Sequence, residues 1–229
     1  MNPTFTLELG GVQLPDTVVV TLGVTLLLTV LLGLGARLAR PRRFTLGQTA
    51  LELFVGWIEQ TVAEVMGEDP QPYVPLVGTL MLFIAVCNAL SVVPVLRPPT
   101  ADLSTATALA LVVFVAVPYF GIRRLGLRAY LAAYLRPTPL LLPINLIGEL
   151  SRTLALCVRL FGNVMSGQMI GAVVLVVAGL LVPIPLAVLG LLTGLIQAYI
   201  FGVLAAVYIA AAVQVERRSH PTTPEVAHE

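Results

Sequence analysis

Long apolar runs dominate the chain, and groups of arginines separate them. One run covers residues 17–39 and ends in arginines, and a second apolar stretch covers residues 73–122. The second stretch is interrupted by a proline-rich turn between Arg97 and Leu103. About 20 apolar residues in a helix are enough to cross a bilayer core. The pattern therefore predicts one crossing in the first range and a helical hairpin of two crossings in the second.

Residues 44–66 follow a different pattern. Apolar positions such as Ile58 and Val62 recur at helical spacing, and acids such as Glu52 and Glu59 fill other positions. A helix with one apolar face and one charged face is typical of the membrane surface. The sequence therefore predicts an amphipathic helix that lies on the cytoplasmic surface.

Residues 140–215 contain two apolar runs that are too long for upright crossings. The first would form a helix of about 38 residues, roughly 57 Å long, which is nearly twice the thickness of the bilayer core. Such a helix has to break, tilt steeply or lie partly across the membrane. After a turn at Pro183 and Pro185, the last run of about 30 residues is roughly 45 Å long. We expect an all-α membrane protein with five transmembrane helices and one surface helix, in which the last two form a long, strongly tilted hairpin.

The positions of the arginines predict the orientation of the chain. Arginines at the ends of crossings favour the cytoplasmic side, which places Arg40, Arg124 and Arg217 there. Residues 1–16 are then external, and residues 216–229 form a cytoplasmic tail. We expect all 229 residues to belong to a single membrane domain.

Composition agrees with a membrane protein and narrows the possible chemistry. The chain is 58% hydrophobic and only 11% charged, with a net charge of +1, whereas roughly 25% charged residues is usual for a soluble domain. Cys87 and Cys157 lie inside apolar runs without the CxxC spacing of a metal or redox site. No nucleotide-binding or hydrolase motif is present. We therefore expect no catalytic site, metal, cofactor or nucleic-acid partner.

Three charged residues fall inside the first of the two long runs. Glu149 and Arg152 are three residues apart near the cytoplasmic entry, so both an interfacial ion pair and a place in an ion path remain open. Arg159 lies two turns deeper, without an acid three or four residues away; its polar neighbour on the same face is Asn163. A charge near the bilayer centre costs at least ~2.5–3.5 kcal/mol. We therefore expect Arg159 to be functional and to meet a carboxylate of another protein.

The last run carries small residues at every fourth position, with Gln197 beside them. Such a stripe allows another helix to approach closely. Ordinary helix packing explains the stripe alone, whereas the stripe and a buried amide together favour a site shared with Arg159. The members of the stripe are Gly190, Gly194, Ala198, Gly202, Ala206 and Ala210.

These residues include motifs of a known family. Arg159-Leu-Phe-Gly-Asn163 resembles the RLFGN signature of subunit a of F-type ATP synthases, and the resemblance covers residues 40–215. Other segments match family-type patterns in the same order. They are Tyr73-Val-Pro75, Asn88, Pro99-Thr-Ala-Asp102, Pro143-Ile-Asn145 to Arg152, and Leu195-Ile-Gln197.

The resemblance implies an ion channel subunit of a rotary motor. It implies two offset half-channels against a ring of c subunits, with Arg159 as a buried arginine that separates them and with protons as the ion. It also implies the c-ring, the subunit b stalk and the rest of the ATP synthase as partners, in a bacterial inner membrane. The expected ion-translocation residues are Arg159, Asn163, Gln197, Gln168, Asp102, Asn88, Glu149 and Arg152. The expected residues for packing against the ring or another helix are Gly190, Gly194, Ala198 and Gly202.

Two positions depart from the family pattern. Many members carry an acid where this chain has Gln168, and a histidine would align with Gly190. Asp102 is then the best remaining acid on the external side, and a sodium-coupled version of the same machine stays open. A self-contained anion channel or transporter, with Arg159 as the ligand, is a rival interpretation. An intramembrane enzyme is disfavoured, because the motifs for a nucleophile or a metal are missing.

Overall fold

The computed structural model describes residues 7–9, 12–14, 16–38, 46–67, 69–91, 98–135, 141–179 and 183–213. These ranges contain seven α-helices, one short 3₁₀-helix and a two-stranded antiparallel hairpin. The elements are β1 (Leu7–Leu9), β2 (Val12–Leu14), α1 (Asp16–Leu38), α2 (Leu46–Met66), α3 (Val74–Leu90), η1 (Pro99–Ala101), α4 (Leu103–Leu125), α5 (Leu127–Leu135), α6 (Leu141–Ala178) and α7 (Pro183–Val213). The predicted helical fold is confirmed, and the β1–β2 hairpin is an addition. Its sequence signal is two glycines between short segments in which apolar and polar residues alternate.

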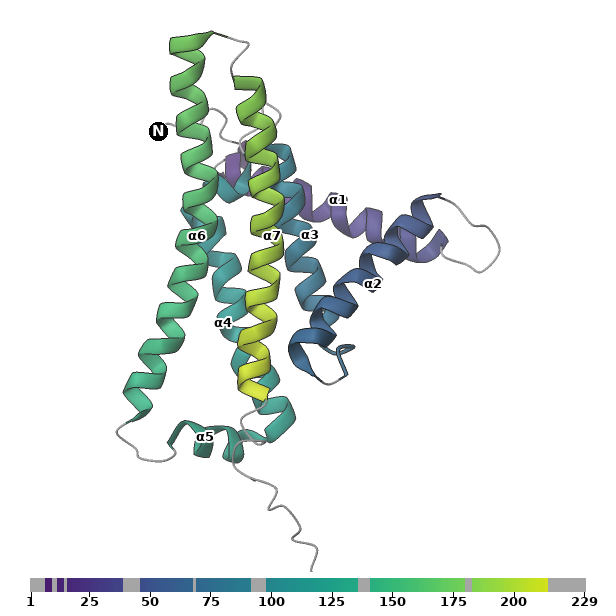
Figure 1. The fold of residues 1–229 in the computed structure, drawn as a ribbon, viewed down its shortest axis with the longest axis vertical. Helices are drawn as coiled ribbons and strands as arrows, with labels where there is room; N and C mark the ends of the chain where they lie inside the picture. The colour runs from purple at the N-terminus through teal and green to yellow at the C-terminus, as the bar shows by residue number, and fades with distance from the viewer. Residues whose placement is uncertain are drawn as a thin grey trace, which may run out of the picture.

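The helices α6 and α7 form the long axis of the molecule and lie side by side (Figure 1). They contain 38 and 31 residues, which correspond to roughly 57 and 46 Å. The α6 helix is continuous from Leu141 to Ala178, so the alternative of a broken helix is wrong. Pro143 lies in its first turn, where a proline removes no helical hydrogen bond. For the same reason α7 begins at Pro183 rather than after Pro185.

The other helices pack around this pair. The α4 helix contacts both α6 and α7, α3 packs along α7, and α2 contacts α3 and α7. In Figure 1, α1 runs crosswise to α6 and α7. The helices α1, α6 and α7 therefore cannot all stand upright in one bilayer, which is consistent with the predicted tilt of the α6–α7 hairpin.

Three of the described helices are long and apolar enough to cross a membrane. They are Leu103–Leu125, Pro143–Val177 and Ile184–Val213. Shorter apolar segments occur at Val18–Val30 in α1 and Val74–Leu90 in α3. The first crossing and the first half of the predicted 73–122 hairpin therefore stay predictions. The end of that half, residues 92–96, lies outside the described residues.

A short helix, α5, follows α4 after a single residue. The chain turns at Gly126, whose φ is 81° and whose N–H donates to the Ile122 carbonyl at 2.8 Å. Such a φ favours glycine, so α4 ends here and α5 begins. Tyr130 of α5 is buried against Gly121 of α4, where any side chain would collide with the tyrosine ring. No helix was predicted for residues 127–135, because the packing of Tyr130 against Gly121 depends on tertiary contacts.

The predicted amphipathic helix is confirmed as α2. Its residues Ile58, Val62 and Met66 are buried, whereas Glu52 and Glu64 are exposed. The apolar face joins the core formed with α3 and α7. Its position on the membrane surface stays a prediction.

Candidate functional site

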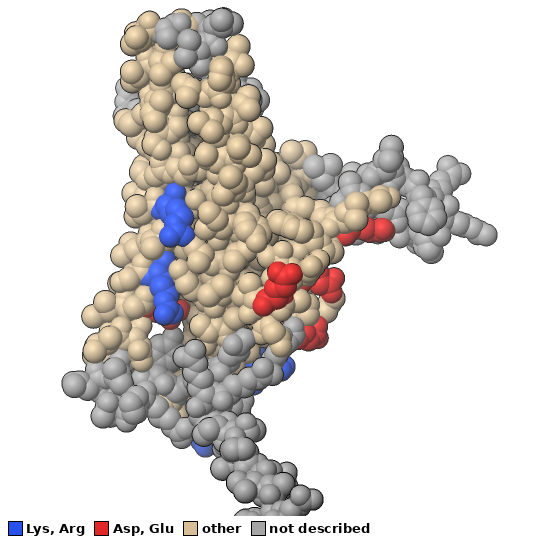
Figure 2. All heavy atoms as spheres, viewed as in Figure 1, with Lys and Arg blue, Asp and Glu red and all other residues tan. Residues whose placement is uncertain are grey.

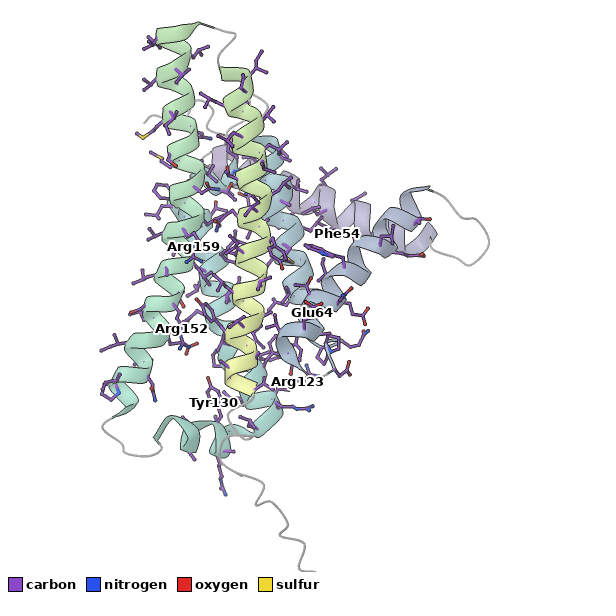
Figure 3. The ribbon with its side chains drawn as sticks, viewed as in Figure 1. Phe54, Glu64, Arg123, Tyr130, Arg152 and Arg159 are labelled. Carbon is purple, nitrogen blue, oxygen red and sulfur yellow. The ribbon has the colours of Figure 1, made fainter. Side chains whose placement is uncertain are left out.

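Two arginines lie on an exposed side of α6, two turns apart. Figure 2 shows them as blue groups on a surface of mostly uncharged residues, and Figure 3 labels them as Arg152 and Arg159. The helix buries a neighbouring face that contains Leu156, Leu160 and Val164. Arg159 was expected to be buried, but its side chain is exposed in this single chain because it lies outside that face.

Exposed apolar residues lie near Arg159 on its helix. Leu154 is 56% and Val158 61% exposed. Within the part of the chain that the structure describes, no hydrogen bond or ion pair involves Arg159. A guanidinium on an apolar membrane surface requires a counter-charge or water. The arrangement therefore leaves one cation available to a group from outside this chain.

One contact shows which residues of α7 lie opposite Arg159. The Asn163 Nδ2 atom donates to the Thr193 carbonyl oxygen at 3.5 Å, which is a long hydrogen bond. The two helices of the hairpin run in opposite directions, and residues four apart share a helix face. One turn back along α6 from Asn163 is Arg159, and one turn forward along α7 from Thr193 is Gln197. Arg159 and Gln197 therefore lie at the same level on neighbouring helices.

Gln197 is a buried amide without a complete set of partners. It is 5% exposed, and its Nε2 atom has no hydrogen-bond partner among the described residues. An unpaired buried polar group costs roughly 1–3 kcal/mol, so such groups usually mark a missing partner. The guanidinium of Arg159 and this amide N–H are both donors. The group that would satisfy them is an acceptor, such as a carboxylate or a water molecule.

Arg152 differs from Arg159 in its contacts. Its Cζ atom lies 5.6 Å from the centre of the Tyr208 ring on α7, which is within the range of a cation–π interaction. The ring therefore holds the guanidinium of Arg152 against α7. Of the two arginines on this face, Arg159 is the one that is not held in this way.

The stripe of small residues on α7 packs against α3 of the same chain. A Cβ atom on Gly194 would lie 2.8 Å from the Cβ atom of Asn88, and one on Gly202 would collide with Met81. Ala198, between these glycines, is 3% exposed. The stripe was expected to pack against the ring or against another helix, and in this chain α3 fills this part of it. The glycines have no side chains, which allows the two helices to approach closely.

Gln168 and Gly190 lie on the side of this site toward the α6–α7 turn. Gln168 is five residues past Asn163, and Gly190 is three residues before Thr193, which are rises of about 7.5 and 4.5 Å. Gln168 is exposed. A Cβ atom built on Gly190 would meet no atom within 4 Å. The position where the family pattern has a histidine is therefore open space in this chain.

The two acids expected in the ion path have different surroundings. The Asp102 carboxylate accepts a hydrogen bond from the Ser104 N–H at 3.1 Å and caps the start of α4. Glu149 is half-buried on α6, ten residues from Arg159, which corresponds to a rise of about 15 Å along the helix. Neither observation assigns these acids a counter-ion role for Arg159.

Three residues of the site were not predicted from the sequence. They are Thr193, Tyr208 and Thr100, which contact Asn163, Arg152 and Asn88. The sequence carried one usable signal, because Tyr208 lies about three helical turns from Gln197 and so falls near the same face of α7. The contacts of Thr100 and Thr193 depend on how separate elements pack, which no spacing within one element specifies.

Comparison with known proteins gives a consistent family. Residues 18–210 match the family described as ATP synthase A chain. The chain is 52% identical over 191 residues to ATP synthase subunit a 2 of Acaryochloris marina, covering 83% of this chain and 82% of that protein. It is 50% identical over 222 residues to ATP synthase subunit a 2 of Pelobacter propionicus, covering 95% and 96%, and 49% identical over 210 residues to ATP synthase subunit a of Nitrosospira multiformis, covering 90% and 82%. Together with the apolar helices and the RLFGN segment on α6, these matches establish that the chain belongs to the ATP synthase subunit a family, the membrane-embedded ion-translocating part of an F-type ATP synthase.

Proposed function

We propose that Arg159 holds an ionised carboxylate of a neighbouring c-subunit ring while that carboxylate exchanges its ion. The observation that carries the proposal is the pairing of an exposed guanidinium with a buried amide donor, Gln197, that lacks an acceptor. Both groups lie at the same level of the α6–α7 hairpin, and the exposed guanidinium is the one that a carboxylate from outside the chain can reach directly. Arginine suits this task because it keeps its charge at any working pH and offers a planar set of donors.

The proposed mechanism separates entry and exit of the ion. An ion enters a half-channel on one side of the membrane, neutralises a ring carboxylate and travels with the ring. When the carboxylate reaches Arg159, the positive charge favours the ionised state, and the ion leaves through the second half-channel. The same charge repels cations and prevents a direct leak. Each charge that crosses 100 mV supplies about 2.3 kcal/mol to rotation.

We propose protons as the ion, with sodium as the alternative. Gln168 cannot titrate, and the space at Gly190 is open, so the outer path works as a hydrated pore rather than a chain of titrating side chains. The ring carboxylate then selects the ion. The test is ATP-driven pumping by the whole complex in proteoliposomes as sodium is varied from trace to high concentration. Sodium-dependent hydrolysis with sodium uptake that survives a protonophore would contradict the proton assignment.

The proposed setting is a bacterial inner membrane with subunit b and the c-ring as neighbours. The N-terminus is external and the C-terminus cytoplasmic, with Arg124 at the cytoplasmic end of α4. A cysteine introduced at position 124 should react with an impermeant reagent only from the cytoplasmic side. Labelling from outside would contradict this orientation.

The role of Arg159 is tested with a matched pair of variants in the complete complex. Arg159→Ala should abolish ion-driven ATP synthesis while the complex still assembles, because the ring carboxylate loses its counter-charge. Arg128→Ala removes an exposed arginine on α5 and should leave synthesis near the wild-type rate. Near-normal synthesis in Arg159→Ala would refute the proposal.

A further inference from the structure

A buried chain of hydrogen bonds joins three separate elements at Asn88. This residue of α3 is 1% exposed. Its Nδ2 atom donates to the Gly194 carbonyl oxygen of α7 at 2.8 Å, and its Oδ1 atom accepts from the Thr100 hydroxyl of η1 at 3.0 Å. Ser91, at the end of α3, donates its hydroxyl to the Asn88 carbonyl at 2.6 Å. Both ends of the amide are therefore engaged within the chain.

These contacts favour a role in which Asn88 and Thr100 hold helices together. They do not favour a place in the lining of a water-filled ion path. A wall residue presents polar atoms to water, whereas Thr100 is 0% exposed and Asn88 nearly so. A buried polar network whose members are satisfied makes a packing arrangement rigid. Neither side chain titrates, so neither can pass a proton by changing its charge.

The α3 helix touches α7 closely at a second point as well. Asn88 meets α7 at Gly194, and Met81 meets it at Gly202, about two turns further along α7 and two turns back along α3. At each point the glycine is required, because a Cβ atom would overlap the α3 side chain. The two points are eight residues apart, a rise of about 12 Å. A helix held at two such points cannot rotate about its axis without losing one of them.

Gln197 lies between the two points. It is three residues after Gly194 and five before Gly202, so the direction of its side chain follows the rotation of α7. The hydrogen bond to Gly194 is a directional contact, whereas the contact at Gly202 is steric. A small rotation of α7 would lose the Asn88 hydrogen bond and change the direction of the Gln197 amide.

We propose that Asn88 and Thr100 are positioning residues that fix the rotation of α7 and thereby hold Gln197 beside Arg159. The inference rests on the proposed function of Arg159 and adds the elements that align its partner. Thr100 acts through Asn88: its hydroxyl occupies the amide oxygen and leaves the amide nitrogen directed at α7. A short segment outside the long helices thus contributes to the alignment of the site.

The test combines a measure of α7 orientation with a measure of ion pumping, both in the complete complex. Cysteines replace Asn163 and Thr193, which face each other across the α6–α7 seam, after Cys87 and Cys157 are changed to alanine. The yield of the 163–193 disulfide under mild oxidation reports the orientation. Pumping is measured in parallel in the same variants without the cysteine pair.

The variants separate positioning from path lining. Asn88→Leu should lower the disulfide yield by about fivefold, since a lost buried hydrogen bond shifts the balance between helix orientations by this order, and pumping should fall with it. Thr100→Val should show a smaller loss of both, and Thr100→Ser, which keeps the hydroxyl, should match the parent. An unchanged disulfide yield in Asn88→Leu, with pumping lost, would overturn the proposal in favour of a path-lining role.

Two further results keep the test decisive. If Asn88→Leu does not assemble, equal disulfide yields in Thr100→Val and Thr100→Ser overturn the proposal, and a loss confined to Thr100→Val supports it. Arg159→Ala should lose pumping with the disulfide yield unchanged. If Arg159→Ala pumps normally, the proposed function of the arginine fails, whereas the disulfide yields still decide what orients α7.

Discussion

The α7 helix forms one interface, or seam, with α3 and another with α6, and the two seams differ in how completely their polar groups are paired. Toward α3, glycines let the backbones approach closely, and the Asn88 amide is hydrogen-bonded at both ends. Toward α6, the hydrogen bond of Asn163 is long, Arg159 is exposed and Gln197 lacks a partner. The first seam is complete within the chain. The second has a cation and an amide N–H for which the described residues provide no acceptor, which is the condition expected of a surface that another subunit completes.

The largest expected effect comes from replacing the guanidinium of Arg159, at the α6–α7 seam, with an ammonium group. Arg159→Lys should reduce ion-driven ATP synthesis by about a hundredfold or more, because an ammonium lacks the planar set of donors and can lose its proton when it is desolvated. The assembled complex should be purified first, so that synthesis is measured per complex. Synthesis within a few-fold of wild type would mean that only the position of a positive charge matters at this site.

Adding a bulky side chain at the α3–α7 seam should have the next largest effect. Gly202→Leu should prevent assembly or coupling, since the side chain would overlap Met81, and overpacking of this kind costs roughly 1–3 kcal/mol or more. The yield of the purified complex and ATP-driven pumping are the measurements.

A milder pair of variants tests the contact between Gly202 and Met81 specifically. Gly202→Ala should show a partial defect, and adding Met81→Ala should restore pumping, because it removes the atoms that the new methyl group meets. Normal coupling in Gly202→Leu would mean that α3 does not lie against α7 at this point in the complex.

A smaller effect is expected where an aromatic ring holds the second arginine. Tyr208→Leu removes the ring over Arg152, and loss of a cation–π interaction costs roughly 0.5–2 kcal/mol. ATP-driven pumping should fall several-fold at most. Tyr208→Phe keeps the ring and should behave like the wild type, and equal defects in both variants would point to the hydroxyl group.

The smallest effect is expected at the open end of the α6–α7 seam. Gln168→Glu should be tolerated, or should shift the pH optimum of pumping, because an exposed side chain beside open space can carry a hydrated carboxylate. The pH profile of ATP-driven pumping measures this. Complete loss of pumping would mean that Gln168 is packed against protein in the complex and that the ion path runs elsewhere.

The sequence predicted the long elements well because their signals are local. The apolar runs give the lengths of α6 and α7, and helical spacing of apolar residues gives α2. The position of Arg159 without a neighbouring acid is also a local fact, since helix geometry fixes which residues can reach it. Helix α5 and the β1–β2 hairpin were missed, although Gly126 and the two glycines between the strands are recognisable turn signals.

The sequence by itself determined that the chain is a helical membrane protein whose long apolar helix carries an arginine, Arg159, with no acid three or four residues away. Chain composition and periodicity suffice for this, because the bilayer penalises charges and open backbone groups wherever they occur. Only the tertiary structure decided which helix fills the small-residue stripe and that Arg159, Gln197 and Asn163 share one seam. Those facts depend on the rotation of α7, which is set by contacts of Asn88, Thr100 and Met81 from elements about a hundred residues away, and no pattern within α7 encodes the identity of its neighbour.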